Sequence, residues 1–264
     1  MKRLAAVLGF PIEHSRSPAM MNAAFAATGL DAVMVPLAVA PADLATVVRG
    51  LAAGGALGAS VTIPHKEAVA QLCDDRSVPA DELGVVNCLA FNGARIVGHN
   101  TDAGGFVDSL ADVGFVARDR RAVLLGAGGA ARAVAAGLAA TGADVTVIAR
   151  DPARVRWTRA RPWTRAELDD AFASTDLLVD CTSTALDAAA EAPVVASLPM
   201  SALPKTALVA SLVYHRAPLL LTTARARKLA ILDGKGMLVH QGARAFTLWT
   251  GEPAPIAVMR AALD

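Results

Sequence analysis

The sequence predicts an α/β fold of two domains, one of them built on a doubly wound parallel sheet. Short apolar runs alternate with segments of helical character along the chain, as they do in sheets that are covered by helices. A glycine-rich turn joins one of these runs to a helical segment near the middle of the chain. The chain has 264 residues, 54% of them hydrophobic and 19% charged, which is enough to bury the cores of two ordinary domains.

The first hundred residues contain five apolar runs that predict strands, at residues 4–8, 32–39, 59–63, 85–91 and 95–97. Ser17 precedes Pro18, so these two residues are expected to be the N-cap and the first position of a helix that ends at Gly29. Further helices are expected from Pro41 to about residue 53, and from Pro64 onward.

The middle of the chain carries the glycine-rich turn. An apolar strand at residues 122–125 runs into Gly126-Ala127-Gly128-Gly129-Ala130-Ala131, which is G-x-G-x-x-A. The first glycine permits a tight turn, the second lets the backbone approach a pyrophosphate, and the small final residue lets the next helix pack close to the strand. That helix, expected from about Gly129 to Thr141, would direct its first N–H groups at an anion. Strand, turn and helix in this order predict a Rossmann-type dinucleotide site, to which Gly126, Gly128, Gly129 and Ala130 belong.

A helix over residues 100–113, opened by the N-capping types Asn100, Thr101 and Asp102, is expected to link the two domains. After the turn, apolar runs predict strands at 144–149, 177–181 and 208–214, and helices are expected from about 164, at 219–229, from Gly236 to Trp249 and at 253–263.

Composition excludes several classes of protein. The formal net charge is +1, so no broad basic field is available for nucleic acid or an anionic membrane. Three widely spaced cysteines fit buried thiols in a reducing compartment rather than a disulfide framework or a metal site. No apolar run reaches the roughly 18 residues that a membrane span needs. We therefore expect a cytoplasmic protein without a metal.

Three polar residues stand where a ligand could bind. Ser15 and Ser17 follow the first strand and open a helix, at the edge where α/β sheets bind small molecules. Lys66 follows Pro64 in the first turn of an expected helix, where the macrodipole disfavours a cation and would push the amine toward its neutral form. The alternatives are that the serines only cap the helix and that Lys66 forms an ordinary exposed ion pair.

Five motifs, in register along nearly the whole chain, resemble the shikimate dehydrogenase family. They are Gly9-Phe10-Pro11-Ile12-Glu13-His14-Ser15-Arg16-Ser17-Pro18, Val61-Thr62-Ile63-Pro64-His65-Lys66, Gly84-Val85-Val86-Asn87, Gly98-His99-Asn100-Thr101-Asp102 and Asp233-Gly234-Lys235-Gly236-Met237-Leu238-Val239-His240-Gln241-Gly242-Ala243. The resemblance implies reversible hydride transfer between shikimate and 3-dehydroshikimate with NADP, in chorismate and aromatic amino acid biosynthesis. It also implies a substrate domain of residues 1–102 with 237–264 around an NADP domain of residues 103–236.

The same resemblance implies roles for individual residues. Lys66 and Asp102 would be the catalytic pair. The residues that would bind the substrate are Ser15, Ser17, Thr62, Asn87, Tyr214 and Gln241, and those that would bind the cofactor, besides the glycine-rich turn, are Arg150, Thr182, Gly236 and Met237. For Met237 the alternative is core packing. A lysine within reach of a secondary alcohol can take the hydroxyl proton, and an adjacent carboxylate orients both groups, so the residue types suit the reaction.

Cofactor choice depends on the end of the second strand of the Rossmann domain. Arg150 is placed to bind the 2′-phosphate of NADP, whereas Asp151, where the family usually has threonine or serine, could repel it unless it caps the helix that begins at Pro152. Asp180, Ala185 and Ser211 also depart from the family's pattern. The alternatives that remain are a quinate/shikimate dehydrogenase that uses NAD and a weakly active, shikimate-binding relative. The protein is expected to be a monomer or a homodimer.

Overall fold

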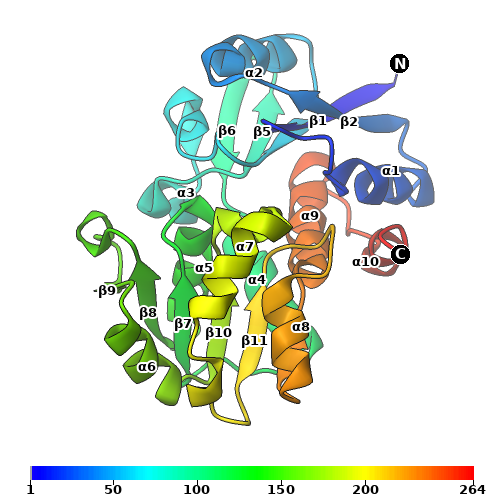
Figure 1. Ribbon diagram of the computed structural model, residues 1–264. Helices are drawn as coiled ribbons and strands as arrows, with labels where there is room; N and C mark the ends of the chain where they lie inside the picture. Colours follow the sequence, from blue (N-terminus) through cyan, green and yellow to red (C-terminus); the bar gives the residue numbers. More distant parts are fainter. Residues whose placement is uncertain (1) are drawn as a thin grey trace. The chain divides into compact units, whose positions relative to one another are not determined.

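A computed structural model describes residues 2–264 of the chain (Figure 1). They divide into two compact units, unit 1 (Met1–Gly105 with Leu238–Asp264) and unit 2 (Phe106–Met237). Each unit is built around one six-stranded sheet with helices, so the expected α/β fold class is confirmed.

The sheet of unit 1 has the strand order β2-β1-β3-β5-β6-β4. Its strands are β1 (Arg3–Gly9), β2 (Ala32–Ala38), β3 (Gly58–Val61), β4 (Asp75–Arg76), β5 (Cys88–Asn92) and β6 (Arg95–His99). The strands β1, β2 and β3 are parallel, and β5 runs antiparallel to both β3 and β6. The helices of this unit are α1 (Ser17–Ala27), α2 (Leu44–Ala53), α3 (Val78–Leu83) and α10 (Ile256–Ala261), with the start of α4 (Asp102–Asp112) and most of α9 (Gly234–Thr250).

The core of unit 1 lies on both faces of this sheet. One cluster joins α2 to the sheet through Leu44 and Val48. Elsewhere in this core, the ring centroids of Phe25 in α1 and Phe246 in α9 lie 5.7 Å apart. A Cβ at Gly58 would fall 2.1 Å from Nε1 of Trp249, so only glycine lets α9 pack this closely on β3.

The sheet of unit 2 is entirely parallel, with the strand order β12-β11-β10-β7-β8-β9. Its strands are β7 (Arg121–Leu125), β8 (Asp144–Ala149), β9 (Arg159–Pro162), β10 (Leu177–Asp180), β11 (Leu208–Ser211) and β12 (Ala230–Leu232). Its helices are the rest of α4 and the start of α9, with α5 (Gly129–Ala140), α6 (Arg165–Ala173), α7 (Ala188–Ser197) and α8 (Leu219–Ala226). The strand order reverses between β7 and β10, and open α/β sheets bind ligands at such a switch point.

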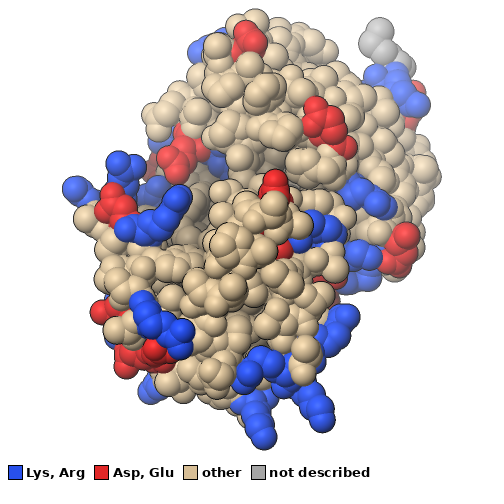
Figure 2. Space-filling model, in the orientation of Figure 1, with Lys and Arg blue, Asp and Glu red and all other residues tan. Residues whose placement is uncertain are grey.

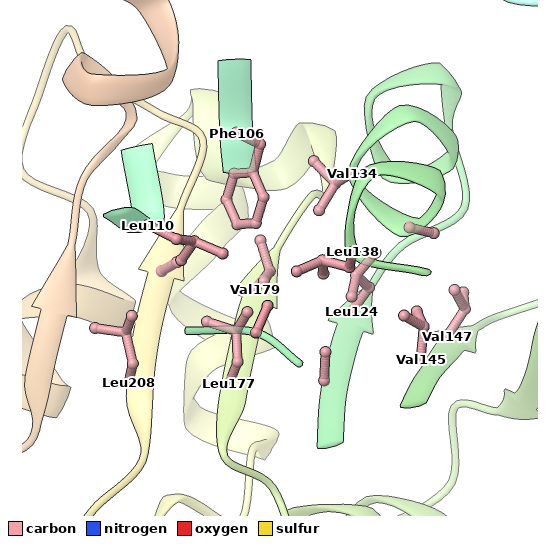
Figure 3. Packing of buried hydrophobic residues seen from close by; sticks show 14 of the residues in the cluster. Phe106, Leu110, Leu124, Val134, Leu138, Val145, Val147, Leu177, Val179 and Leu208 are labelled. Carbon is pink, nitrogen blue, oxygen red and sulfur yellow. The ribbon is translucent and has the colours of Figure 1, made fainter. Parts of the chain in front are cut away.

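Helices cover both faces of this second sheet. Figure 3 shows Phe106 and Leu110 of α4 and Val134 and Leu138 of α5 packed against β7, β8, β10 and β11. A second cluster packs α6, α7 and α8 against the same strands from the other face, with Phe172 among its buried residues. The sheet is therefore doubly wound, as the sequence predicts, and its strands are apolar on both sides.

Several boundaries differ from the sequence prediction. The strand at 208–214 ends at Ser211, the one at 177–181 ends at Asp180, and the one at 85–91 begins at Cys88. Apolar residues beyond these points are buried in loops, and burial alone does not distinguish a strand from a buried loop. The prediction also lacked β4, α3, β9, α7 and β12, which are short or, in the case of α7, contain an internal proline, Pro193.

The surface carries no extended field of one sign on the side that Figure 2 shows. Blue and red side chains are mixed over much of it, with a group of basic side chains near the C-terminal end of α8, where Arg225, Arg227 and Lys228 are exposed. Among the described residues, no helix is both long and apolar enough to span a membrane. The three cysteines are free thiols, and only Cys88 is fully buried.

Candidate active site

A lysine and an aspartate form the charged centre of unit 1. Nζ of Lys66 lies 2.6 Å from Oδ2 of Asp102, and the two side chains are only 14% and 7% exposed. The residues come from different segments, since Lys66 follows β3 and Asp102 is the first residue of α4. This close, sheltered pair differs from an ordinary exposed ion pair, for which side-chain entropy and screening cancel most of the attraction.

The helix expected from Pro64 is not formed. Residues 63–64 and 66–68 form turns, and a short 3-10 helix begins only at Val69. Lys66 therefore does not lie in the first turn of an α-helix, and the prediction that a helix dipole disfavours its charge is wrong. The helix is expected because Pro64 suits a first helical position, but a proline can open a turn as readily as a helix.

Asn87 binds the carboxylate oxygen of Asp102 that does not accept from Lys66. Its Nδ2 donates to Oδ1 of Asp102 at 2.9 Å and to Oγ1 of Thr101 at 2.9 Å, and its Oδ1 accepts from the backbone N–H of Thr101 at 2.6 Å. Both amide hydrogens of Asn87 are thus used within the protein. Asn100 caps α4, because its Oδ1 accepts from the N–H of Ala103 at 3.2 Å. The position of Asp102 is therefore fixed through its side chain and through the start of its helix.

The predicted substrate residues in unit 1 lie on loops that follow neighbouring strands. Ser15 lies between β1 and α1, Ser17 is the first residue of α1, and Thr62 follows β3. The two loops are joined where the N–H of Phe10 donates to the carbonyl of Ile63 at 3.0 Å. Gln241 lies in α9, largely buried, and its Nε2 donates to the carbonyl of Leu238 at 2.7 Å.

Ser17 does not cap its helix. Arg16 occupies the N-cap position of α1 and makes no capping hydrogen bond with its side chain, while Ser17 is buried within the first turn. Oγ of Ser15 instead accepts from the N–H of Ser17, at 3.4 Å. The predicted N-cap is wrong because α1 begins one residue earlier than the Ser-Pro pair indicates. The hydroxyl of Ser17 is then not committed to the backbone as a cap.

The glycine-rich turn of unit 2 lies at the switch point between β7 and β10. Gly126 has φ +96°, a conformation that side chains rarely adopt, and a Cβ at Gly128 would meet no atom within 4 Å. Ala131 is fully buried at the start of α5, while the turn before it is partly exposed. The residues present fit a dinucleotide, because the turn leaves open space at the N-terminus of a helix, where pyrophosphate binds.

Of the remaining predicted cofactor residues, Thr182 lies beside that turn and Met237 belongs to the core. Thr182 follows β10, and its Cγ2 would lie 3.2 Å from a Cβ at Gly126. Arg150 is exposed at the end of β8. Gly236 and Met237 lie in the first turn of α9, which begins two residues before Gly236, and Met237 belongs to the core cluster of Phe106 and Leu110. Core packing, the alternative for Met237, is therefore observed.

Asp151 does not act as an N-cap. Its side chain makes no capping hydrogen bond to the 3-10 helix Pro152–Arg154, and its Oδ2 lies 3.0 Å from Nε of Arg154. Asp151 is therefore paired with Arg154, and its expected role as a helix cap is wrong. Tyr214, the one predicted substrate residue outside unit 1, is half-buried after β11 in unit 2.

Two buried polar groups have contacts that the sequence analysis does not predict. Thr101 is 4% exposed and its hydroxyl accepts from Asn87. Its place in an N-capping motif is the signal that could have indicated this role. Glu191 is fully buried in α7 and pairs with Arg216, and no sequence signal pointed to it. Among residues 2–264, no three His, Cys, Asp or Glu side chains are grouped so that they could hold a metal ion.

Three family descriptions match the chain. The shikimate dehydrogenase substrate binding domain matches residues 7–89, a putative NAD(P)-binding domain matches residues 115–197, and the shikimate 5'-dehydrogenase C-terminal domain matches residues 234–263. A protein of Symbiobacterium thermophilum named shikimate dehydrogenase (NADP(+)) is 41% identical over an alignment of 277 residues, gaps included. The alignment covers 98% of this chain and 93% of that protein.

Two crystal structures have the same fold over their whole length. Shikimate dehydrogenase from Aquifex aeolicus matches with a TM-score of 0.91 at 30% identity, covering 99% of this chain and 97% of that one. Shikimate 5-dehydrogenase from Thermus thermophilus, in complex with NADP(H) and shikimate, matches with a TM-score of 0.88 at 33% identity, covering 99% of this chain and 98% of that one.

Proposed function

This chain belongs to the shikimate dehydrogenase family, and from that premise we propose that it transfers hydride reversibly between shikimate and 3-dehydroshikimate with NADP as the cofactor. The observation that carries the proposal is the sheltered network of Lys66, Asp102 and Asn87. A secondary alcohol loses a proton and a hydride when it becomes a ketone, and bound NADP would supply the acceptor for the hydride and its electron pair.

Lys66 handles the proton in this proposal. In its neutral form, Nζ takes the proton of the reacting hydroxyl as the C–H bond breaks, and in the reverse direction the ammonium returns it. Asp102, at 2.6 Å, orients Nζ and stabilises the ammonium once it has formed.

Asn87 has two possible roles, as a substrate ligand or as the residue that orients Asp102. Because its two amide hydrogens bind Thr101 and Asp102, we assign it chiefly to orientation, with only the free capacity of Oδ1 left for substrate. The other substrate contacts are assigned to hydroxyl and amide side chains, which match the hydroxyls and carboxylate of shikimate, namely Ser15, Ser17, Thr62, Tyr214 and Gln241.

The cofactor is assigned to unit 2. The backbone of Gly126, Gly128, Gly129 and Ala130 would hold the pyrophosphate at the start of α5. Arg150 would bind the 2′-phosphate, since a guanidinium can donate two hydrogen bonds to it. Thr182 and Gly236 would contact the rest of the cofactor. Unit 1 would accordingly be the substrate domain and unit 2 the NADP domain.

One assay tests the proposal. Initial rates are measured for shikimate and for quinate, each with NADP and with NAD, on the purified protein. The highest kcat/KM is expected for shikimate with NADP. A higher kcat/KM with NAD would make Asp151 the candidate ribose ligand, and a higher value with quinate would make the protein a quinate/shikimate dehydrogenase. Binding of shikimate without turnover in any of the four combinations would leave a binding relative.

A further inference from the structure

One arginine of unit 2 joins the loop that follows β11 to the segments that follow β10, at the carboxyl ends of these parallel strands. Arg216 is in the loop between β11 and α8, and its Nη2 donates to Oε2 of Glu191 at 2.6 Å and also to the carbonyl of Ala185. The side chain of Arg216 is 21% exposed and that of Glu191 only 1%. A pair this buried is costly to break, because the remaining charge would have no compensation.

Glu191 carries the connection onward. Its second oxygen, Oε1, accepts from the backbone N–H of Leu220 at 3.1 Å, in the first turn of α8. A carboxylate is favoured there by the unpaired N–H groups at a helix start. Glu191 itself belongs to α7, so this one side chain joins α7 to α8 and to the guanidinium of Arg216.

Ala185 lies in the segment that lines the glycine-rich turn. This segment, residues 182–186, leaves β10 at Thr182, whose N–H donates to Oδ1 of Asp180 at 2.9 Å. The hydroxyls of Thr182 and Thr184 are hydrogen-bonded at 2.6 Å. At this same residue, Thr182, the segment lies against Gly126, where an added Cβ would be 3.2 Å from Cγ2 of Thr182. A small shift of the segment would therefore change the space above the turn.

We propose that Arg216 is a positioning residue for the dinucleotide. Its guanidinium donates to the buried carboxylate of Glu191 and to the carbonyl of Ala185, and so links the two. This link keeps residues 182–186 in the conformation that places Thr182 beside the glycine-rich turn. Arg216 acts through this segment and is not assigned a contact with the cofactor. Such preorganisation lowers the entropy lost when the cofactor binds. The inference rests on the proposed function, because it assumes that unit 2 binds NADP.

The test removes both charges together, so that no buried charge is left unpaired. In the double variant E191Q/R216M, glutamine can still accept from the N–H of Leu220, while the link to Ala185 is lost. The matched control is R165A, which removes an exposed arginine of the same unit that pairs with Asp169. Dissociation constants for NADP and for shikimate are measured by titration calorimetry for the parent protein and both variants, well below their Tm values.

The expected result is a dissociation constant for NADP about tenfold higher in E191Q/R216M than in the parent, with that for shikimate unchanged and R165A like the parent. A lower Tm with both dissociation constants unchanged would overturn the inference, because Arg216 would then only stabilise the fold. An equal loss for both ligands would overturn it too. If the parent binds NAD instead, the same comparison is made with NAD. A parent that binds neither dinucleotide contradicts the proposed function and this inference with it, whereas a parent that binds while the variant is unchanged contradicts the inference alone.

Discussion

At the scale of single residues, Asp102 divides its carboxylate between two partners. One oxygen accepts from Lys66 and the other from Asn87. Charge-assisted hydrogen bonds of this kind are short and directional, so the carboxylate has little freedom to turn. The orientation of Asp102 therefore depends on Asn87 as well as on Lys66. Asn87 is uncharged, and none of its hydrogen bonds described above is to Lys66.

The first prediction concerns Asn87. Asn87→Ala removes both hydrogen bonds to Thr101 and the one to Asp102, so kcat is expected to fall roughly tenfold while the dissociation constant for shikimate changes little. The loss of buried hydrogen bonds should also cost about 1–3 kcal/mol in the free energy of unfolding. Steady-state kinetics and binding titration measure the two effects. Asn92→Ala, at an exposed position of β5, serves as the control. A large loss of shikimate affinity with kcat unchanged would instead make Asn87 a substrate ligand.

The second prediction concerns cofactor choice. Arg150→Ala should weaken NADP much more than NAD, by roughly ten- to a hundredfold, because a charge-assisted contact of about 1.5–3 kcal/mol is lost. Asp151→Ser should improve NADP only modestly, since the carboxylate already pairs with Arg154 at 3.0 Å. The ratio of kcat/KM for the two cofactors is the readout. Equal weakening of both cofactors by Arg150→Ala would exclude a phosphate contact.

The third prediction concerns the buried carboxyl of Asp180. Burial raises its pKa from the ordinary value of 3.8. Hydrogen bonds from Thr182 lower it by less, and the charges of Glu191 and Arg216 have smaller, opposite effects. A raised pKa in the folded state means that the contribution of Asp180 to stability is full below its unfolded pKa and is lost as the pH rises through the folded pKa. The Tm of Asp180→Asn, relative to the parent, should therefore increase from acid to neutral pH. A Tm of Asp180→Asn that falls relative to that of the parent as the pH rises would contradict this assignment.

At the scale of helices and loops, the starts of two helices differ in how they are capped. Asp187 caps α7, because its Oδ1 accepts from the N–H groups of Ala189 and Ala190 at 2.7 and 3.3 Å. Ser17, whose sequence resembles a cap, makes no such bond at the start of α1. The Ser-Pro pair shows where a helix is possible, but the preceding loop decides where it starts.

The fourth prediction follows from that contrast. Asp187→Ala should reduce the free energy of unfolding by about 1 kcal/mol through the lost cap, while Ser17→Ala should cost only a few tenths of that value. Ser17→Ala should instead raise the KM for shikimate, as should Ser15→Ala, because each removes a hydroxyl assigned to the substrate. Thermal unfolding and steady-state kinetics measure the two effects. A Tm loss in Ser17→Ala equal to that in Asp187→Ala, with KM unchanged, would restore its role as a cap.

At the scale of the whole molecule, the sequence predicts the two sheets and the glycine-rich turn because these depend on local patterns. A buried parallel strand is a short apolar run, and a pyrophosphate turn needs glycine at fixed positions, so both are visible in one dimension. The network of Asn87, Thr101 and Asp102 was only partly predictable. Motifs brought these residues to attention, but which amide hydrogen binds which oxygen depends on how β5 and α4 meet.

Other features could not be predicted from the sequence. The pair of Arg216 and Glu191 joins residues from a loop and from a helix that were not expected to be neighbours, and α7 itself was hidden by its internal proline. Pro64 suits a helix start and so predicts a helical position for Lys66, whereas the chain forms turns there. Long-range contacts decided each of these cases, and no local propensity contains them.

The central claim, that Lys66 handles the proton in hydride transfer between shikimate and NADP, is tested most directly by the kcat of Lys66→Met. The variant is compared with the parent and with Lys205→Met, which removes an exposed lysine, and shikimate binding is measured alongside. We predict a loss in kcat on the order of 10² or more, with the dissociation constant for shikimate within a few-fold of the parent's and Lys205→Met fully active. A kcat of Lys66→Met close to that of the parent would contradict the account.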